Sequence, residues 1–119
     1  MTSKRDYRRG DVVKVRLDPV EGSEQGGTRP VLVVSNDVLN ETLPVLTVAV
    51  ITSRKVERIF PTEVLISPPE GGLRKPSKVL LYQLRTISKD RVSGKMGEIG
   101  QGTLSAVEQA LCIALDLPW

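Results

Sequence analysis

Histidine is absent from the 119-residue sequence, and cysteine occurs once, at Cys112. Histidine is the side chain that titrates near neutral pH when unperturbed, so its absence excludes every mechanism that depends on an imidazole base. A single cysteine excludes an internal disulfide, and with no histidine beside it a zinc site is disfavoured as well. We therefore expect a protein with no metal site and no cofactor.

Aromatic residues make up only 3% of the chain, which disfavours a broad aromatic platform for single-stranded nucleic acid. No apolar run is long enough to span a bilayer and no cleavable signal sequence is recognisable, so we expect a cytoplasmic protein that does not contact a membrane.

The 17 Lys+Arg and 14 Asp+Glu give a net charge of +3, which permits a polyanionic partner without requiring one. The length fits a single domain over 1–119, in which the polar and basic stretch 1–8 is expected to be a mobile arm.

Short runs of β-branched residues predict a mainly β fold. Over 12–17, Val13, Val15 and Leu17 alternate with Lys14 and Arg16, as in a half-exposed strand. The continuous apolar run 31–34 is expected to be a strand buried on both faces. Other strands are predicted over 45–51, 62–66, 79–87 with regular alternation, and 92–99 as a weak edge strand.

The last element has a different period, because Leu104, Val107, Leu111 and Leu115 recur at helical spacing. Thr103 is the expected N-cap of this helix, which would cover one open end of the sheet. Several short strands followed by one terminal helix predict a small, partly open β-barrel of SH3-like type with a C-terminal helix.

The most informative segment is the glycine-rich stretch from Gly22 to Pro30, which delivers Arg29 to the beginning of the strand at 31–34. Glycines let a backbone approach a ligand closely, and a guanidinium offers a permanently charged fork of donors that suits a phosphate. Two interpretations stay open: a loop that holds an anion, and a plain hairpin connection with one solvated arginine.

Thr52 ends another apolar strand, much as Arg29 begins one. If the two strands are neighbours, Arg29 would stabilise charge on a pentacoordinate phosphorus and Thr52 would donate to a non-bridging oxygen. Glu24 would orient Arg29 or take a proton. The alternatives are an ordinary β-former at position 52 and a solvated carboxylate at position 24.

Other polar residues extend this set. Ser53 and Arg54 add donors after Thr52, and Arg54 suits a role in positioning a phosphate. Gln83 would read a base edge and Arg85 would hold a phosphate, unless that face of their strand simply meets solvent. The basic segment 73–78 is interpreted as a solvated turn.

Six segments, in this order and spacing, closely resemble the MazF/PemK toxins of toxin–antitoxin modules, and the resemblance spans about 8–115. They are Arg9–Val13, Gly22–Gln25, Thr28–Ser35, Ile51–Ser53, Lys75–Ser77 and Gln83–Ile87.

The resemblance implies an SH3-like barrel that forms a homodimer and cuts single-stranded RNA without a metal. The expected reaction is attack of a ribose 2′-OH on the adjacent phosphate, which leaves a 2′,3′-cyclic phosphate and a 5′-OH. The family's catalytic arginine and threonine correspond to Arg29 and Thr52, and Glu24 matches a loop glutamate implicated in some members. The residues expected to bind RNA are Gln25, Thr28, Ser53, Arg54, Gln83 and Arg85.

Such toxins are silenced by an antitoxin, so the resemblance also implies a MazE-like partner whose acidic C-terminal segment occupies the RNA groove. The chain departs from many relatives at Tyr82, where they carry an acidic residue, and a changed base preference or a stacking surface would follow. One alternative is a non-catalytic toxin of the same fold that poisons a DNA gyrase–type target, an idea that Trp119 keeps open. Another is a plain SH3-like RNA-binding module.

Overall fold

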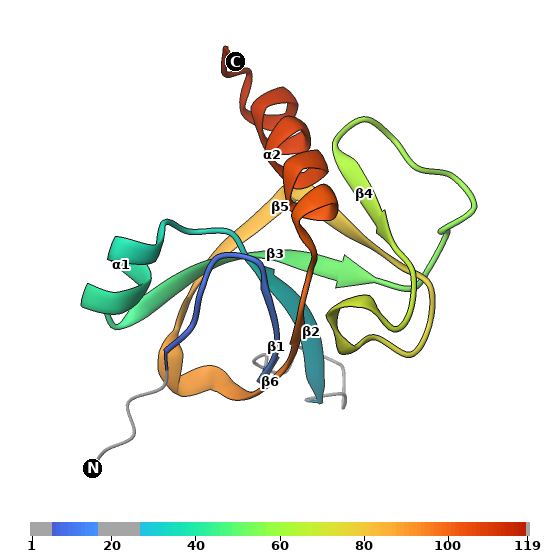
Figure 1. Cartoon of the computed structure of the whole chain (residues 1–119). Coiled ribbons are helices and arrows are strands. Elements are labelled where there is room, and N and C mark those ends of the chain that lie inside the picture. The colour runs from blue at the N-terminus through green and yellow to red at the C-terminus, as the bar shows by residue number, and fades with distance from the viewer. Residues whose placement is uncertain (1–5, 17–26, 119) are drawn as a thin grey trace, which may run out of the picture.

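Figure 1 shows a computed structural model of the chain, which describes residues 6–16 and 27–118. Six strands form one antiparallel sheet in the order β4-β5-β3-β2-β1-β6, in which the outer strands β4 and β6 are not paired with each other. The sheet curls without closing, which confirms the predicted mainly β fold with a partly open barrel and a C-terminal helix. The elements are β1 (Asp11–Arg16), β2 (Thr28–Val33), α1 (Asp37–Thr42), β3 (Val45–Thr52), β4 (Glu63–Ile66), η1 (Glu70–Gly72), β5 (Ser77–Ser88), η2 (Lys89–Arg91), β6 (Val92–Glu98) and α2 (Gln101–Leu115).

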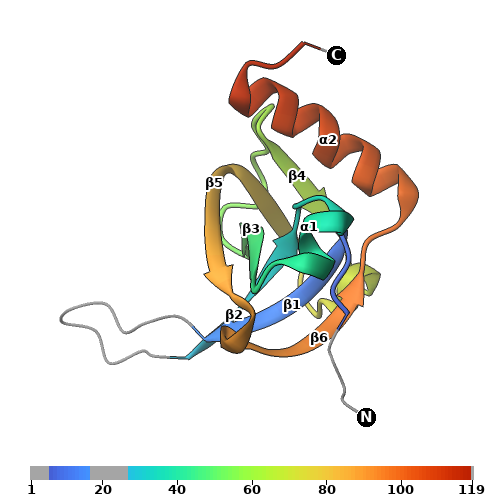
Figure 2. The same ribbon diagram turned by 90° about the vertical axis from the view of Figure 1, so that its left-hand side faces the viewer.

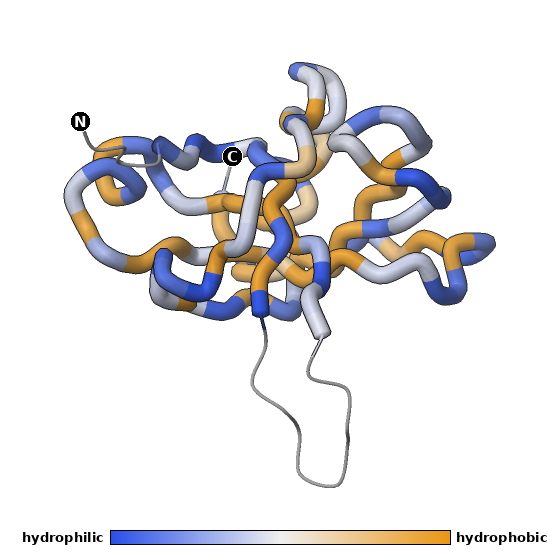
Figure 3. Tube along the Cα trace, turned by 90° about the horizontal axis from the view of Figure 1, so that it is seen from below, coloured by the Kyte–Doolittle hydropathy of each residue, from blue (hydrophilic) through white to orange (hydrophobic). Residues whose placement is uncertain are grey.

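The curled sheet buries apolar side chains on both of its faces. In β2, Leu32 belongs to a first buried cluster, which also contains Val12 and Ile51. Val31 and Val33 belong to a second buried cluster on the other face. This confirms the strand buried on both faces that the run 31–34 predicted. Val13 and Val15 of β1 lie in the second cluster, with Lys14 and Arg16 exposed as expected. Hydrophobic segments gather toward the middle of the fold, and many of the hydrophilic ones lie at its periphery (Figure 3).

Helix α2 packs against β4 and β5 and covers that end of the sheet, as predicted (Figure 2). Val107 and Ala110 insert into the first cluster. The prediction of Thr103 as N-cap is wrong, because the helix begins at Gln101 with Gly100 as its N-cap. The cause is a tertiary contact, in which the Gly100 N–H donates to Glu70 Oε2 at 2.8 Å. Among the described residues, no helix has the length and apolar character needed to cross a membrane.

Strand β5 is not the regular strand that its sequence predicted. Ala49 of β3 pairs with Leu84, but the next residue, Val50, pairs with Leu80. Leu81 to Gln83 therefore form a bulge, and a bulge bends a strand and redirects its side chains. As a result Leu81 and Leu84 both pack on the first cluster, which uniform alternation would have prevented.

A glycine contact joins η1 to β6. A Cβ on Gly97 would lie 2.7 Å from the carbonyl carbon of Gly71 and 2.7 Å from the nitrogen of Gly72. Both atoms belong to the backbone and cannot turn away as the end of a side chain can. The close approach fixes η1, and with it the segment that follows, against the edge strand of the sheet.

We expect Gly97→Ala to lower the free energy of unfolding by about 1–3 kcal/mol, because the added methyl overpacks this contact. The matched control is Gly94→Ala in the same strand, where a Cβ would meet nothing within 4 Å. That change should be neutral or stabilise by up to about 1 kcal/mol, since alanine restricts the unfolded chain. Urea unfolding of both variants measures the difference, and equal effects would contradict the packing argument.

Candidate functional site

A broad groove with a volume of about 1030 Å³ lies where several strand ends meet. Its walls come from β1, the beginning of β2, the end of β3, the segment from η1 into β5, and β6. Because these elements are distant in sequence, only the sheet order brings them together. The described lining residues are Lys14, Gly27, Thr28, Arg29, Pro30, Ile51, Thr52, Ser53, Arg54, Gly72, Leu73, Arg74, Lys75, Ser77, Ser93, Gly94, Lys95 and Met96.

The groove is strongly cationic. Its described lining includes six basic residues and no aspartate or glutamate; the six are Lys14, Arg29, Arg54, Arg74, Lys75 and Lys95. Lys95 is partly neutralised, because its Nζ lies 3.2 Å from Oδ1 of the buried Asp11 and 3.7 Å from Glu98 Oε1. A concave surface of one charge sign focuses the potential and attracts a polyanion.

Arg29 lies exposed at the second position of β2. Its Cα is the register partner of Val15 in β1, which fixes the backbone that carries it. Strand β2 pairs with β3 through Val31 and Val50, and continuing that antiparallel register by two residues sets Arg29 opposite Thr52. Both residues of the predicted pair line the groove, and the continued register would set them at neighbouring positions on one wall.

Thr52 ends β3 half-buried, with its hydroxyl held in a defined position. Thr52 Oγ1 accepts a hydrogen bond from the backbone N–H of Arg54 at 3.1 Å. The oxygen is used as an acceptor there, so the hydroxyl proton remains available to donate into the groove. The same short turn directs Ser53 and Arg54 to the groove, as the sequence predicted for donors next to Thr52.

The remaining predicted residues are placed differently. Glu24 and Gln25 lie outside the described residues. Gln83 and Arg85 are exposed on β5, but the groove lining does not include them. Gln83 lies within the β5 bulge, and Arg85 pairs with Val48, well away from the strand end at Thr52.

Sequence reasoning missed much of the groove's positive charge. The segment 73–78 is not a solvated turn, because Leu73 is buried, Arg74 and Lys75 line the groove, and Lys78 is buried within β5. The alternation in 12–17 predicts that Lys14 is exposed, but its position opposite Gly94 of β6 depends on the strand order. A periodic pattern within one segment cannot show that Ser93, Gly94, Lys95 and Met96 of β6 line the same groove.

Chemically, this groove can bind and stabilise negative charge. Arginine and lysine stay protonated at neutral pH, so the described lining residues offer donors and positive charge rather than a base. The described residues contain no cluster of three or more His, Cys, Asp or Glu side chains that could hold a metal ion. The arrangement suits electrostatic stabilisation of a phosphate that gains charge during a reaction.

Residues 8–115 match the family described as PemK-like, MazF-like toxin of type II toxin-antitoxin system. A curated relative, Endoribonuclease EndoA of Bacillus subtilis (strain 168), is 43% identical over 110 residues, which is 92% of this chain and 95% of the relative.

Two solved structures from mycobacterial species have similar folds. One is an endoribonuclease with a TM-score of 0.79 and 27% identity, which covers 97% of this chain and 96% of its own. The other is an endoribonuclease in complex with its cognate antitoxin, with a TM-score of 0.78 and 29% identity, and it covers 93% of this chain and 96% of its own.

Proposed function

The chain belongs to the family of PemK-like and MazF-like toxins and is an endoribonuclease of a toxin–antitoxin module, and we propose that its cationic groove binds and cuts single-stranded RNA. The observation that carries this proposal is the position of Arg29 and the Thr52 hydroxyl on one wall of a groove with six basic residues. The relatives named above give no support to the alternative of a gyrase poison.

In the proposed reaction, a ribose 2′-oxygen forms a bond to the adjacent phosphorus while the bond from phosphorus to the 5′-oxygen breaks. The 2′-OH loses a proton and the leaving 5′-oxygen gains one, so the products carry a 2′,3′-cyclic phosphate and a 5′-OH. Arg29 stabilises the charge on the pentacoordinate phosphate, and Thr52 donates its hydroxyl proton to a non-bridging oxygen. Glu24 orients Arg29 or accepts the proton of the 2′-OH.

Other residues hold the RNA strand. Thr28, Ser53 and Arg54 line the groove beside the reacting phosphate and bind its neighbours along the strand. We propose that Gln25, Gln83 and Arg85 also contact RNA, the latter two where the strand leaves the groove along β5.

The partner of this toxin is an antitoxin, consistent with the antitoxin complex of a mycobacterial relative. We propose that a MazE-like acidic segment inhibits the enzyme by occupying the cationic groove in place of RNA. We further propose that the toxin forms a homodimer and acts in the cytoplasm, where messenger RNA is translated.

The test is cleavage of a mixed-sequence single-stranded RNA in excess EDTA, with Thr52→Ala and Thr52→Ser alongside. We expect the unaltered protein to cut at a few discrete sites and to leave 2′,3′-cyclic phosphate ends. Thr52→Ala should lower the cleavage rate at saturating RNA by about 10²–10³-fold, the usual effect of losing one donor to developing charge. Thr52→Ser keeps the hydroxyl and should retain most of the rate.

Binding is measured separately, with an RNA that has a 2′-deoxynucleotide at the position of the attacking 2′-OH. The affinity of Thr52→Ala for this uncleavable RNA should change little. An equal loss of rate and affinity would make Thr52 a binding residue. Cleavage that requires an added divalent cation would contradict the metal-independent reaction.

A further inference from the structure

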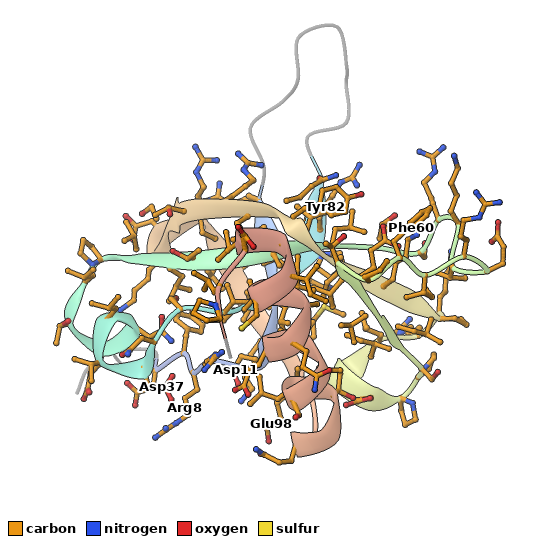
Figure 4. The ribbon with its side chains drawn as sticks, turned by 90° about the horizontal axis from the view of Figure 1, so that it is seen from above. Arg8, Asp11, Asp37, Phe60, Tyr82 and Glu98 are labelled. Carbon is orange, nitrogen blue, oxygen red and sulfur yellow. The ribbon has the colours of Figure 1, made fainter. Side chains whose placement is uncertain are left out.

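Two exposed aromatic side chains, Phe60 and Tyr82, lie outside the lining of the groove. Phe60 is 50% exposed and Tyr82 is 53% exposed, and they appear on the same side of the molecule (Figure 4). Of the other two aromatic residues in the chain, Tyr7 is buried and Trp119 lies outside the described residues. A sequence so poor in aromatics thus presents two of them on one side.

A buried ion pair lies between these two rings. Lys78 Nζ donates to Glu63 Oε1 at 2.9 Å, and the side chains are 6% and 4% exposed. Lys78 Nζ also donates to the carbonyl of Arg58 at 3.0 Å. Burying two charges costs about as much as their attraction returns, so such a pair is weak evidence for stability alone and needs another explanation.

The ion pair holds both aromatic residues. Glu63 Oε1 accepts the backbone N–H of Phe60 at 3.0 Å, and Lys78 Nζ lies 5.9 Å from the centre of the Phe60 ring, within the range of a cation–π contact. On the other side, the Tyr82 hydroxyl lies 3.5 Å from Glu63 Oε2. The hydroxyl of Tyr82 and the backbone of Phe60 are tied to the same carboxylate, while about half of each side chain remains open to solvent.

Strand register places this cluster next to Thr52. The Cα atoms of Thr52 and Lys78 are direct partners in β3 and β5, and those of Glu63 and Leu80 are partners in β4 and β5. The Glu63 carboxylate contacts residues of β5 on both sides of Leu80, with Lys78 Nζ at 2.9 Å from Oε1 and the Tyr82 hydroxyl at 3.5 Å from Oε2. Paired Cα atoms in antiparallel strands are about 4.5–5.5 Å apart. A nucleotide whose phosphate lies at Thr52 would have a neighbouring base within reach of the two rings.

We propose that Phe60 and Tyr82 form a stacking site for one nucleobase of the RNA, next to the bond that is cut, and that the Glu63–Lys78 pair positions both rings. This inference rests on the proposed function. Single-stranded RNA is recognised chiefly by stacking of splayed bases on aromatic side chains. Truncating one stacking ring weakens binding on the order of 10- to 100-fold.

The test uses the uncleavable RNA with the fluorescent base 2-aminopurine at each position next to the cleavage site in turn. We expect the unaltered protein to quench the fluorescence at one position, because stacking quenches this base. Phe60→Ala and Tyr82→Ala should each lose the quench and raise KM for a cleavable RNA about 10-fold or more. Tyr82→Phe keeps the ring but removes the hydroxyl that contacts Glu63, so it should retain a reduced quench, whereas Tyr82→Leu keeps bulk without a ring and should lose the quench.

Val38→Ala is the matched control, since it trims an exposed apolar side chain, 66% exposed, on the distant helix α1. It should change neither KM nor the quench. Glu63→Gln keeps the shape of the side chain and removes its charge. If Glu63 positions the rings, this variant should show a smaller quench when the RNA is saturated with folded protein. A loss of stability alone would lower the amount of folded protein but not the quench of the RNA bound to it.

The outcomes separate this inference from the function on which it rests. If the unaltered protein cuts RNA and the ring variants keep its KM and its quench, the stacking site is wrong and the ribonuclease stands. If the unaltered protein cuts no RNA, the proposed function fails instead. If the ring variants lose affinity for the antitoxin but none for RNA, the two rings bind the protein partner and the nucleobase site is overturned.

Discussion

Replacing Arg29 with alanine should lower the cleavage rate at saturating RNA by about 10³-fold, the scale on which a single arginine stabilises phosphoryl transfer. Arg29 lies exposed in the groove, and the extended β2–β3 register sets it opposite Thr52. Its guanidinium is always charged and presents a fixed fork of donors that matches phosphate oxygens. Single-turnover kinetics with RNA in EDTA measures the loss, and expression of the variant in cells should no longer arrest growth.

Arg54→Ala is the matched control, because it also removes one positive charge from the groove close to Thr52. We expect Arg54→Ala to act mainly on affinity. The slope of the logarithm of the binding constant against the logarithm of the salt concentration should fall by about one, as for the loss of one phosphate contact. Arg29→Lys keeps the charge but not the fork and should recover only part of the rate. If Arg29→Ala and Arg54→Ala have the same effect on rate and affinity, Arg29 binds phosphate without a special role in the reaction.

The sequence predicted those parts of the fold that local patterns determine. The strand at 31–34 was predictable because its side chains are apolar without interruption and meet a buried cluster on each face. The face of α2 was predictable because Val107 and Ala110 follow the helical period. Both signals are carried by neighbouring residues, so neither depends on knowing the rest of the structure.

Features that depend on tertiary contacts were not predictable in this way. The bulge at Leu81 to Gln83 is defined by the register of β5 with β3, in which Ala49 pairs with Leu84 and Val50 with Leu80. Helix α2 begins at Gln101 because Glu70 holds the N–H of Gly100. Each depends on a residue far along the chain, which a periodic pattern in one segment does not contain.

The residues of the candidate site also fall into those that the sequence alone could identify and those that it could not. Arg29 and Thr52 were recognisable as strand-end residues, and their proximity required only that β2 and β3 be neighbours. By contrast, the sequence around Lys78 predicts a solvated turn, although Lys78 is buried against Glu63 fifteen positions earlier. Its burial is evident only once the register of β4 with β5 is known.

Breaking the Glu63–Lys78 pair should have the largest effect on stability of any side-chain change proposed for this protein. Lys78→Met fills a similar volume but leaves the buried Glu63 carboxylate without its cation. Removal of one partner of a buried ion pair typically costs about 3–5 kcal/mol. Because domains are stable by only about 5–15 kcal/mol, this is a large share of the total. Urea unfolding at pH 7 measures the loss.

The control is Arg8→Met, which breaks the exposed ion pair of Arg8 and Asp37. Arg8 Nη1 lies 3.8 Å from Asp37 Oδ2. An exposed pair contributes about 0–1 kcal/mol, so this variant should remain close to the unaltered protein. The double variant Glu63→Leu with Lys78→Met should regain much of the stability that Lys78→Met alone loses, because no unpaired charge remains buried. Loss of less than about 1 kcal/mol in Lys78→Met would mean that water reaches the carboxylate.

The dependence on pH distinguishes a buried charge from simple loss of packing. Burial on its own would raise the pKa of Glu63, but hydrogen bonds from the Phe60 N–H and Lys78, the charge of Lys78 and the Tyr82 hydroxyl hold that pKa below its usual value. The carboxylate therefore contributes stability above the unfolded pKa of about 4.3, and that contribution is lost as the pH falls through the lower folded value. Without Lys78, its hydrogen bond and its charge are lost, so the pKa of Glu63 should rise from that lowered value. The cost of Lys78→Met should then shrink on acidification from pH 7, as the carboxyl takes up a proton, whereas a cost that stays constant with pH would assign the effect to packing.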